Sequence, residues 1–244
     1  MRGEIRARAA GSERDGMWDF IRERLAELKG RIQEAARRAA RQPEQITLVA
    51  VSKTFPAEAI RAAWEAGLRD FGENYVQEFE RKSQELGRLE GARFHLIGHL
   101  QSNKARRAAQ LFDLIHTVDS LRLARRLEEA TAVLRPEGRL PVMIEVKLSG
   151  EQAKSGVPVG ELEPLVEALR GCPHLELTGL MTMPPFFEDP EASRPYFRRL
   201  RELAAACRLP CLSMGMSHDF EVAVEEGATH LRIGTALFGP RKTA

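Results

Sequence analysis

The segment ITLVAVSK, residues 46–53, decides the fold class. It is a nearly continuous run of strand-forming residues that ends at a single lysine. Such a run, without alternating polar positions, is typical of a strand buried on both faces of a parallel sheet. Pro56 opens a helix just after it, at a position where a missing N–H costs little, and Gly67 ends that helix. The segment therefore predicts a strand followed by a helix, the repeating unit of an α/β fold.

The same strand-then-helix pattern recurs along the rest of the chain. A leading helix is expected over residues 17–41, where apolar residues recur at three- and four-residue steps. Further strands are expected over residues 68–75, 94–99, 114–118, 141–148, 175–182, 211–216 and 229–239. Helices are expected between these strands. One ends at Leu86, one covers residues 103–111, and one follows a cap at Asp119 or Ser120. Two more cover residues 162–170 and 191–207, and the last ends at Glu226.

About eight strands alternating with helices is the number that a (β/α)8 TIM barrel requires. The expected fold class is therefore α/β, a (β/α)8 barrel with an additional N-terminal helix. A doubly wound open sheet is the alternative, because a count of strands does not show closure. No linker or shift in composition divides the chain, so we expect one domain over residues 17–244, preceded by a poorly ordered extension over 1–16.

Composition fits this fold. The 244 residues carry 37 Lys and Arg against 35 Asp and Glu, a formal net charge of +2, and 43% are hydrophobic. These values exclude a disordered, collagen-like or membrane chain, and the length matches a barrel of about 250 residues. The charge balance gives no sign of a nucleic-acid binder, and no apolar run approaches the roughly 18–20 residues of a membrane span. We expect neither nucleic acid nor a membrane among the partners.

The cysteines and the N-terminus indicate the compartment. Cys172, Cys207 and Cys211 are odd in number and lack metal-type spacing, so we expect buried free thiols in a reducing cytosol. A secretory signal requires an apolar segment, which the Arg- and Ala-rich first residues lack. The protein is therefore expected in the cytoplasm.

Polar residues stand at the carboxyl ends of the expected strands, and these ends meet at one rim of a parallel barrel. Lys53 ends the first strand behind the apolar segment LVAVS. A partly desolvated lysine has a lowered pKa and becomes a usable amine nucleophile. A lysine that extends from a strand end to solvent is the alternative for this residue taken alone.

Ser217, Gly234 and Thr235 fall after the seventh expected strand and within the eighth, where barrels often bind phosphate. Ser217 is expected to precede a helix, so that its hydroxyl and the adjacent amides form an anion site, and Gly234 lets the backbone approach a ligand closely. The alternative is an ordinary serine N-cap and a glycine required by packing. The position of these residues in the barrel favours phosphate.

Arg232 lies inside the last expected strand, between two apolar residues. A guanidinium that points into a barrel needs a partner, because an unpaired buried charge is very costly. An ion pair with an acid such as Glu145 is the structural alternative to a ligand. His95, His99 and His116 lack the spacing of metal ligands, and we expect them to be histidines of the core or the rim.

An amine, a phosphate site and a buried arginine at one rim suit an aldehyde-bearing phosphate ester bound as a Schiff base. Pyridoxal 5′-phosphate (PLP) is the first candidate. A Schiff-base aldolase that acts on sugar phosphates would use similar residues, and the residues alone leave both interpretations open.

Several segments resemble the PLP homeostasis protein family, whose members are also called YggS or PROSC proteins. They are AVSKTFP, DFGENYVQE, FHLIGHLQSNK, GLMTMPP and SMGMSHDFEVAVEEGATHLRIGTALFG, in consistent order between about Ile46 and Arg241. The resemblance implies a single barrel similar to the N-terminal domain of alanine racemase, which is the type III fold of PLP proteins. It also implies that Lys53, in AVSK, forms the Schiff base with PLP.

The resemblance assigns further residues to the cofactor. Ser217 in GMS would hold the phosphate together with Gly234 and Thr235 in RIGT, and Arg232 would face the pyridine nitrogen. The resemblance also places Asn74 and His99 on the lining of the cofactor pocket. A guanidinium has a pKa above about 12 and remains a donor. The ring is then unprotonated and a poorer electron sink.

The function implied by the resemblance is PLP binding for intracellular vitamin B6 homeostasis. Such a protein buffers the reactive aldehyde and delivers it to apo-enzymes, and we expect no catalytic turnover, because the sequence leaves no length for the second domain of the racemases. A minimal PLP-dependent amino-acid racemase-like enzyme is the alternative. The expected partners are PLP and apo PLP-dependent enzymes, and the expected state is a monomer or weak dimer.

Overall fold

The computed structural model describes residues 18–149 and 155–240. The extension expected over residues 1–16 lies outside these ranges. Within them, no helix combines the length and the apolar character needed to cross a bilayer. Cys172, Cys207 and Cys211 are free and only partly buried.

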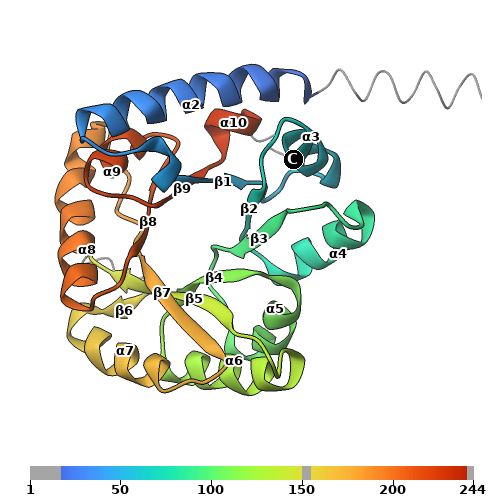
Figure 1. Ribbon diagram of the computed structural model, residues 1–244, viewed down its shortest axis with the longest axis vertical. Helices are drawn as coiled ribbons and strands as arrows, with labels where there is room; N and C mark the ends of the chain where they lie inside the picture. Colours follow the sequence, from blue (N-terminus) through green and yellow to red (C-terminus); the bar gives the residue numbers. More distant parts are fainter. Residues whose placement is uncertain (1–17, 150–154, 241–244) are drawn as a thin grey trace, which may run out of the picture.

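Eight parallel strands of the described residues close into a barrel (Figure 1). They are β1 (Thr47–Val51), β2 (Asp70–Glu73), β3 (Arg93–Leu96), β4 (Leu114–Val118), β5 (Leu140–Lys147), β7 (Leu175–Met181), β8 (Cys211–Met216) and β9 (His230–Ile233). Around the ring their order is β4, β3, β2, β1, β9, β8, β7 and β5, and the pairing of β4 with β5 closes it. The short β6 (Val157–Pro158) pairs only at the edge of β5. Closure confirms the expected (β/α)8 barrel and excludes the open sheet.

Helices surround the barrel (Figure 1). The α-helices are α2 (Phe20–Arg38), α3 (Ala57–Glu65), α4 (Val76–Leu86), α5 (Ala105–Leu111), α6 (Leu121–Leu134), α7 (Leu162–Arg170), α8 (Arg194–Ala206), α9 (Phe220–Glu225) and α10 (Thr235–Phe238). Short 3-10 turns lie at Pro43–Gln45, Ser102–Lys104, Val159–Glu161 and Pro190–Ser193.

The additional N-terminal helix, α2, packs against α9 and α10 (Figure 1). Its inner face buries Ile21, Leu25, Leu28 and Ile32, which recur at three- and four-residue steps. Full burial of one such side chain contributes roughly 1.5–3 kcal/mol. The leading helix expected from the sequence is thus part of the folded barrel domain and covers the region where the chain's last strand and helix lie.

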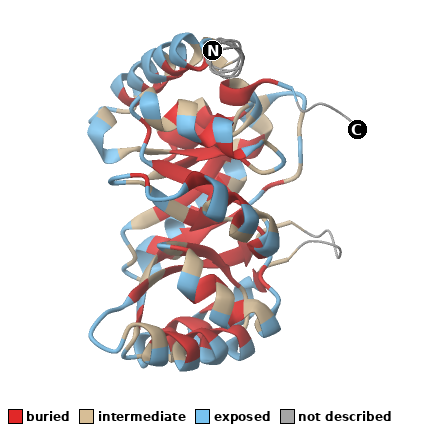
Figure 2. Ribbon diagram, turned by 90° about the vertical axis from the view of Figure 1, so that its right-hand side faces the viewer, coloured by how far each residue is buried: buried red, intermediate tan, exposed pale blue. Residues whose placement is uncertain are grey.

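Buried residues concentrate on the strands and on the helix faces turned toward them, while the outer helix faces are exposed (Figure 2). The barrel interior is partly polar, because His95, His116, Ser213 and Arg232 are all buried there. Buried polar groups require hydrogen-bond partners, and the partners of these four residues determine the floor of the site described below.

The last expected strand, over residues 229–239, is wrong in its second half. β9 ends at Ile233, and residues 235–238 form the helical turn α10. Gly239 ends this turn at φ +87°, a left-handed conformation that glycine adopts without strain. An apolar segment as short as TALF has too few residues for its periodicity to separate a strand from a helix.

Three other expected strands end two or three residues earlier than predicted. β1 stops at Val51, β2 at Glu73 and β3 at Leu96, so Lys53, Asn74 and His99 stand in the loops that follow. The loops still begin at the same rim of the barrel. Parallel strands bring all their carboxyl ends to that rim, and the site is built there.

Candidate functional site

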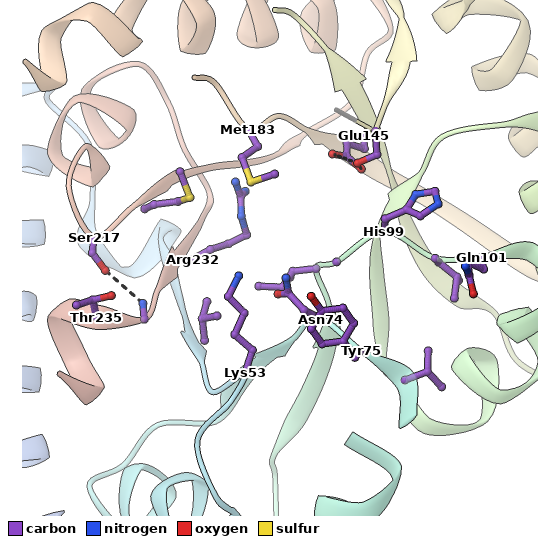
Figure 3. A pocket seen from close by; sticks show the side chains of 18 of the residues that line it. Lys53, Asn74, Tyr75, His99, Gln101, Glu145, Met183, Ser217, Arg232 and Thr235 are labelled. Atoms are coloured by element: carbon purple, nitrogen blue, oxygen red, sulfur yellow. Dashed lines mark hydrogen bonds between the residues drawn. The ribbon is translucent and has the colours of Figure 1, made fainter. Parts of the chain in front are cut away.

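The rim at the carboxyl ends of the strands is hollowed into a cavity of about 620 Å³ (Figure 3). Its walls come from the ends of several strands and the loops that follow them. All the residues singled out from the sequence line this one cavity: Lys53, Asn74, His99, Ser217, Arg232, Gly234 and Thr235. Residues far apart in the chain meet here because each follows, or ends, a strand of the same parallel barrel.

Lys53 stands two residues beyond the end of β1, and its side chain extends into the cavity (Figure 3). The loop around it has a fixed conformation. Thr54 adopts φ +68°, which is unusual for a residue other than glycine, and its N–H donates to Glu78 Oε1 over 2.6 Å. The N–H of Phe55 donates to the Ser52 carbonyl over 3.0 Å and closes the turn. The lysine thus projects from an ordered loop.

A buried ion pair supports this loop from below. Lys82, on α4, donates from Nζ to Glu73 Oε1 over 2.8 Å and to the Ser52 carbonyl over 2.8 Å. The Ser52 hydroxyl also donates to Glu73 Oε1, over 2.7 Å. Burial raises the pKa of the Glu73 carboxyl above its ordinary value, and the Lys82 ammonium opposes that rise. The pair anchors Ser52, the residue immediately before Lys53.

The contacts of Ser217 exclude the alternative of an ordinary N-cap. This residue does not cap the helix that follows, because α9 begins at Phe220 and Asp219 occupies its N-cap position. Instead, its Oγ accepts hydrogen bonds from the backbone N–H groups of Gly234, over 3.3 Å, and Ala236, over 3.2 Å (Figure 3 draws the first). Two backbone N–H groups at the start of α10 are thus directed toward the Ser217 hydroxyl oxygen.

Gly98 and Gly234 both line the cavity, but only Gly98 is required by packing within the protein. A Cβ at Gly98 would lie 2.3 Å from the Asn74 carbonyl oxygen, so glycine is required for two loops to touch. A Cβ at Gly234 would meet nothing closer than the Val51 carbonyl oxygen at 3.5 Å, an ordinary contact. Packing within the protein therefore leaves room at Gly234, next to backbone N–H donors.

Arg232 lies in β9 and is buried in the cavity wall. Its Nη1 donates to Ser213 Oγ over 2.7 Å, and its Nη2 donates to the Thr182 carbonyl over 2.9 Å. These partners are neutral oxygens, whereas Glu145 acts on Arg232 through its charge across the site. Burial lowers the pKa of Arg232 to about 10, so the guanidinium remains cationic at neutral pH. A guanidinium has five N–H donors, and donors remain for a ligand.

Asn74 and His99 form the opposite side of the cavity. Asn74 follows β2 directly, and Figure 3 shows it across the cavity from Ser217 and Thr235. His99 is half exposed, and its Nδ1 lies 3.2 Å from Asp119 Oδ2. The histidine is therefore held at the mouth of the cavity by a carboxylate that follows β4.

The cavity also contains residues to which the sequence reasoning gave no role in binding. Tyr75, Met183 and Phe186 are exposed large side chains that line it. Tyr75 and Met183 come directly after Asn74 and Thr182, so their position beyond a strand end is a signal that could have identified them. The carboxylate of Glu145 accepts from the Ser155 hydroxyl over 3.0 Å, and burial raises the pKa of this carboxyl.

Among the residues that the structure describes, no group of three or more His, Cys, Asp or Glu side chains is arranged to hold a metal ion. The cavity instead combines a primary amine, a group of anion-binding N–H donors and a buried cation. These groups fit an aldehyde-bearing aromatic phosphate such as PLP, with the amine for the aldehyde and the N–H donors for the phosphate.

Comparisons with known proteins lead to the same cofactor. Residues 24–242 match the family model of the alanine racemase N-terminal domain. The pyridoxal phosphate homeostasis protein of Pseudomonas aeruginosa is 48% identical over 225 residues, which cover 91% of this chain and 96% of that protein. The protein of the same name from Escherichia coli K12 is 46% identical over 235 residues, which cover 91% and 97%.

A solved structure with the same fold is PipY of Synechococcus elongatus PCC7942 with PLP bound. It is 40% identical, has a TM-score of 0.80, and the match covers 90% of this chain and all of that one. Such identities over nearly complete chains show common ancestry. The chain belongs to the pyridoxal phosphate homeostasis protein family, whose barrel is that of the alanine racemase N-terminal domain.

Proposed function

We propose that this protein binds PLP in the cavity, holds it through the Lys53 amine as a Schiff base, and serves intracellular PLP homeostasis by buffering and delivering the cofactor without turnover of a substrate. The observation that carries the proposal is the convergence of Lys53, Arg232 and the N–H donors around Ser217 on one cavity of about 620 Å³. The PLP-bound structure of PipY supports the same cofactor.

PLP supplies an aldehyde that condenses with a primary amine and releases water. Among the residues that the structure describes, two lysines line the cavity, Lys53 and Lys104. Lys104 donates to Gln77 Oε1 over 3.0 Å, and this contact is exposed. Lys53 extends into the cavity from a loop that is ordered by hydrogen bonds, and it is the lysine that we assign to the aldehyde.

The remaining residues would orient the cofactor. Ser217, Gly234 and Thr235 would bind the phosphate with the backbone donors at the start of α10. Arg232, in β9, would donate to the pyridine nitrogen. We further assign to Asn74 and His99 the side of the cavity across from the phosphate group.

Arg232 is also the basis for the proposed lack of turnover. Even with its pKa lowered to about 10, the guanidinium does not give up a proton near neutral pH. A pyridine nitrogen that only accepts a hydrogen bond stays unprotonated, and an unprotonated ring stabilises a carbanion poorly. His99 lies 3.2 Å from the Asp119 carboxylate, and Glu145 accepts a hydrogen bond from Ser155. The geometry thus favours binding over amino-acid chemistry.

The mouth of the cavity supports the delivery part of the proposal. Tyr75, Met183 and Phe186 are exposed there, and such apolar side chains are typical of a surface that contacts another protein. Apo PLP-dependent enzymes are the proposed recipients. We also propose that the protein acts in the cytoplasm, as a monomer or weak dimer, with one barrel domain over residues 17–244.

The test uses the purified protein and its absorbance spectrum. Titration with PLP is expected to give a roughly stoichiometric complex whose visible band is removed by borohydride, and peptide mass spectrometry is expected to find the reduced adduct on Lys53. Lys53→Ala abolishes the band, whereas the control Lys104→Ala keeps it. Retention of the same band in Lys53→Ala would overturn the assignment.

Turnover is tested separately. Alanine, serine and threonine are incubated with the PLP-loaded protein, and the rates of racemisation and deamination are expected to match those of free PLP. A rate far above that of free PLP would establish the alternative, a minimal racemase-like enzyme. A protein that binds no PLP but is trapped by borohydride on a ketose phosphate would establish an aldolase.

A further inference from the structure

A continuous chain of hydrogen bonds runs from Arg232 through the barrel interior. Arg232 Nη1 lies 2.7 Å from Ser213 Oγ, and the same oxygen lies 2.8 Å from His116 Nδ1. His116 Nε2 lies 2.9 Å from His95 Nδ1, and His95 Nε2 lies 2.9 Å from Asp70 Oδ1. We call these residues, Arg232, Ser213, His116, His95 and Asp70, the interior chain.

The interior chain crosses the barrel from the cavity toward the opposite rim. Its members come from five strands, β9, β8, β4, β3 and β2, and none is more than 7% exposed. Asp70 is the first residue of β2 and also accepts from Arg93. Nε of Arg93 lies 2.8 Å from Oδ1 of Asp70, and Nη2 lies 2.8 Å from Oδ2. The chain therefore begins at a cation in the cofactor cavity and ends at an anion on the far side.

The two ends fix the direction of donation. A guanidinium can only donate hydrogen bonds, and a carboxylate can only accept them. Burial by itself raises the pKa of Asp70, but the hydrogen bonds from His95 and Arg93 outweigh burial and hold that pKa below its ordinary value. Asp70 is therefore a carboxylate at neutral pH, and the chain runs from donor to acceptor in one direction.

Only one arrangement of protons then satisfies every bond with neutral imidazoles. A neutral imidazole has one N–H donor and one acceptor nitrogen, and a serine has one O–H. Because the Asp70 carboxylate only accepts, the Nε2–H of His95 donates to it, and His95 Nδ1 accepts from the Nε2–H of His116. His116 Nδ1 then accepts from the Ser213 hydroxyl, whose oxygen accepts from Arg232.

The surroundings favour neutral rings at His116 and His230. Burial, with the nearby positive charges, lowers the pKa of His116 well below its ordinary value. His230, on β9, faces both rings, at centroid distances of 5.7 Å from His116 and 6.2 Å from His95. Burial lowers the pKa of His230 to about 4, so this neighbour is also neutral near pH 7. The charges that face the chain are those of Asp219 and Glu145, which act on Arg232, and at the far end those of Asp70 and Arg93.

We propose that Ser213, His116, His95 and Asp70 are positioning residues that hold Arg232 in one orientation, as a hydrogen-bond donor toward the cofactor. This inference rests on the proposed function for the cofactor and its place in the cavity. Hydrogen bonds in a chain polarise one another, so the Asp70 carboxylate makes the Ser213 oxygen a better acceptor for Arg232.

The arrangement also explains why the charge of Arg232 has neutral oxygens as its direct partners. A carboxylate in direct contact binds a guanidinium through two parallel N–H bonds. The interior chain instead occupies one donor, on Nη1, and the Thr182 carbonyl occupies another, on Nη2. The buried charge is thereby stabilised while other donors are left for the ligand in the cavity.

The test uses Ser213→Ala, which removes one oxygen, and Asp70→Asn, which removes the terminal charge. Thr131→Val is the matched control, because Thr131 is a fully buried residue whose hydroxyl donates to the Leu127 carbonyl within α6. Two spectra are recorded by nitrogen-15 NMR. The first detects the imidazole nitrogens of the protein without cofactor, and the second detects the ring nitrogen of labelled PLP bound to it.

We expect both His95 and His116 to be neutral Nε2–H tautomers in the wild type, with strongly downfield N–H protons. The bound ring nitrogen is expected to be unprotonated and hydrogen-bonded. Ser213→Ala and Asp70→Asn are expected to retain stoichiometric PLP but to move the ring-nitrogen signal downfield, because the donor from Arg232 is weakened. Thr131→Val leaves both spectra as in the wild type.

Two results would overturn the inference. One is an Nδ1–H tautomer or a doubly protonated ring at His95 or His116 in the wild type at pH 7. The other is a ring-nitrogen signal that stays unchanged in Ser213→Ala and in Asp70→Asn, each of which folds and binds PLP. A wild-type protein that binds no PLP would instead overturn the proposed function, and with it the role of the chain toward a cofactor, whatever the tautomers are.

Discussion

The Nζ of Lys82 lies 2.8 Å from Oε1 of Glu73, and both side chains are buried beneath the loop that carries Lys53. The same ammonium lies 2.7 Å from Glu78, whose carboxylate accepts the Thr54 N–H. A buried ion pair contributes little net stability, because desolvation offsets the attraction between the charges. The pair connects α4 and β2 to the backbone on both sides of Lys53.

Lys82→Met is expected to destabilise the protein by roughly 3–5 kcal/mol, because the change leaves the Glu73 charge buried without its partner. The double variant Lys82→Met/Glu73→Gln is expected to recover much of this loss. Urea unfolding measures both free energies, and a PLP titration measures whether the Lys53 loop remains competent. A loss below about 1 kcal/mol in the single variant would contradict a charged Glu73 that depends on Lys82.

Where local signals surround an element on both sides, the sequence predicted its bounds correctly. The strands over 114–118 and 211–216 and the helix over 162–170 are found with the bounds expected. Each is an apolar segment enclosed by polar or turn residues. The segment 235–238 lacks such a boundary, since it continues the apolar run of β9 after one glycine, and the expected strand is a helical turn.

The location of the site followed from the topology, whereas its contacts did not. Parallel strands bring their carboxyl ends together, so the sequence alone predicts Lys53, Ser217 and Arg232 on one rim. The partners of Ser217 and Arg232 depend on which side chains face each other across the barrel. That pairing is set by the stagger of the closed sheet, which the order of residues along the chain does not contain.

The buried histidines make stability depend on pH. An unfolded histidine takes up a proton near pH 6.5, whereas burial lowers the pKa of His230 to about 4 in the folded protein. Between these values the unfolded state binds more protons, so the free energy of unfolding decreases as the pH falls. The slope is about 1.4 kcal/mol per pH unit for each such histidine. The pKa of His116 is also lowered, and this residue contributes in the same direction.

Urea unfolding at several pH values between 4.5 and 6.5 measures this slope, and these limits are set by the pKa values of His230 in the folded and unfolded states. In His230→Gln the slope is expected to be shallower by the contribution of one proton, because His116 remains. An identical slope in the variant and the wild type would show that His230 is not the neutral, partly buried group inferred from its surroundings.

Ser217→Ala separates phosphate binding from aldehyde binding. The change removes the hydroxyl that accepts from Gly234 and Ala236 and that is proposed to contact the phosphate. A hydrogen bond to a charged group is worth about 1.5–3 kcal/mol, so the dissociation constant for PLP is expected to rise by roughly 10- to 150-fold. Pyridoxal, which has no phosphate, serves as the matched ligand, and its affinity is expected to change little. Equal losses for PLP and pyridoxal would place the phosphate elsewhere.

Gly98→Ala and Gly234→Ala each add a methyl group to the cavity wall, and we expect the first to affect mainly stability and the second mainly PLP binding. At Gly98 a Cβ would lie 2.3 Å from the Asn74 carbonyl oxygen, so alanine must displace backbone, and we expect a loss of about 1–3 kcal/mol in the free energy of unfolding. At Gly234 the nearest atom is 3.5 Å from the added Cβ, so the expected loss is roughly 1 kcal/mol or less, whereas the PLP affinity falls because the methyl occupies the proposed phosphate space. Urea unfolding measures the stability of both variants, and PLP titration measures their affinity for the cofactor. A Gly234→Ala protein that is stable and binds PLP as tightly as the wild type would show that the space beside the N–H donors is not where the phosphate binds.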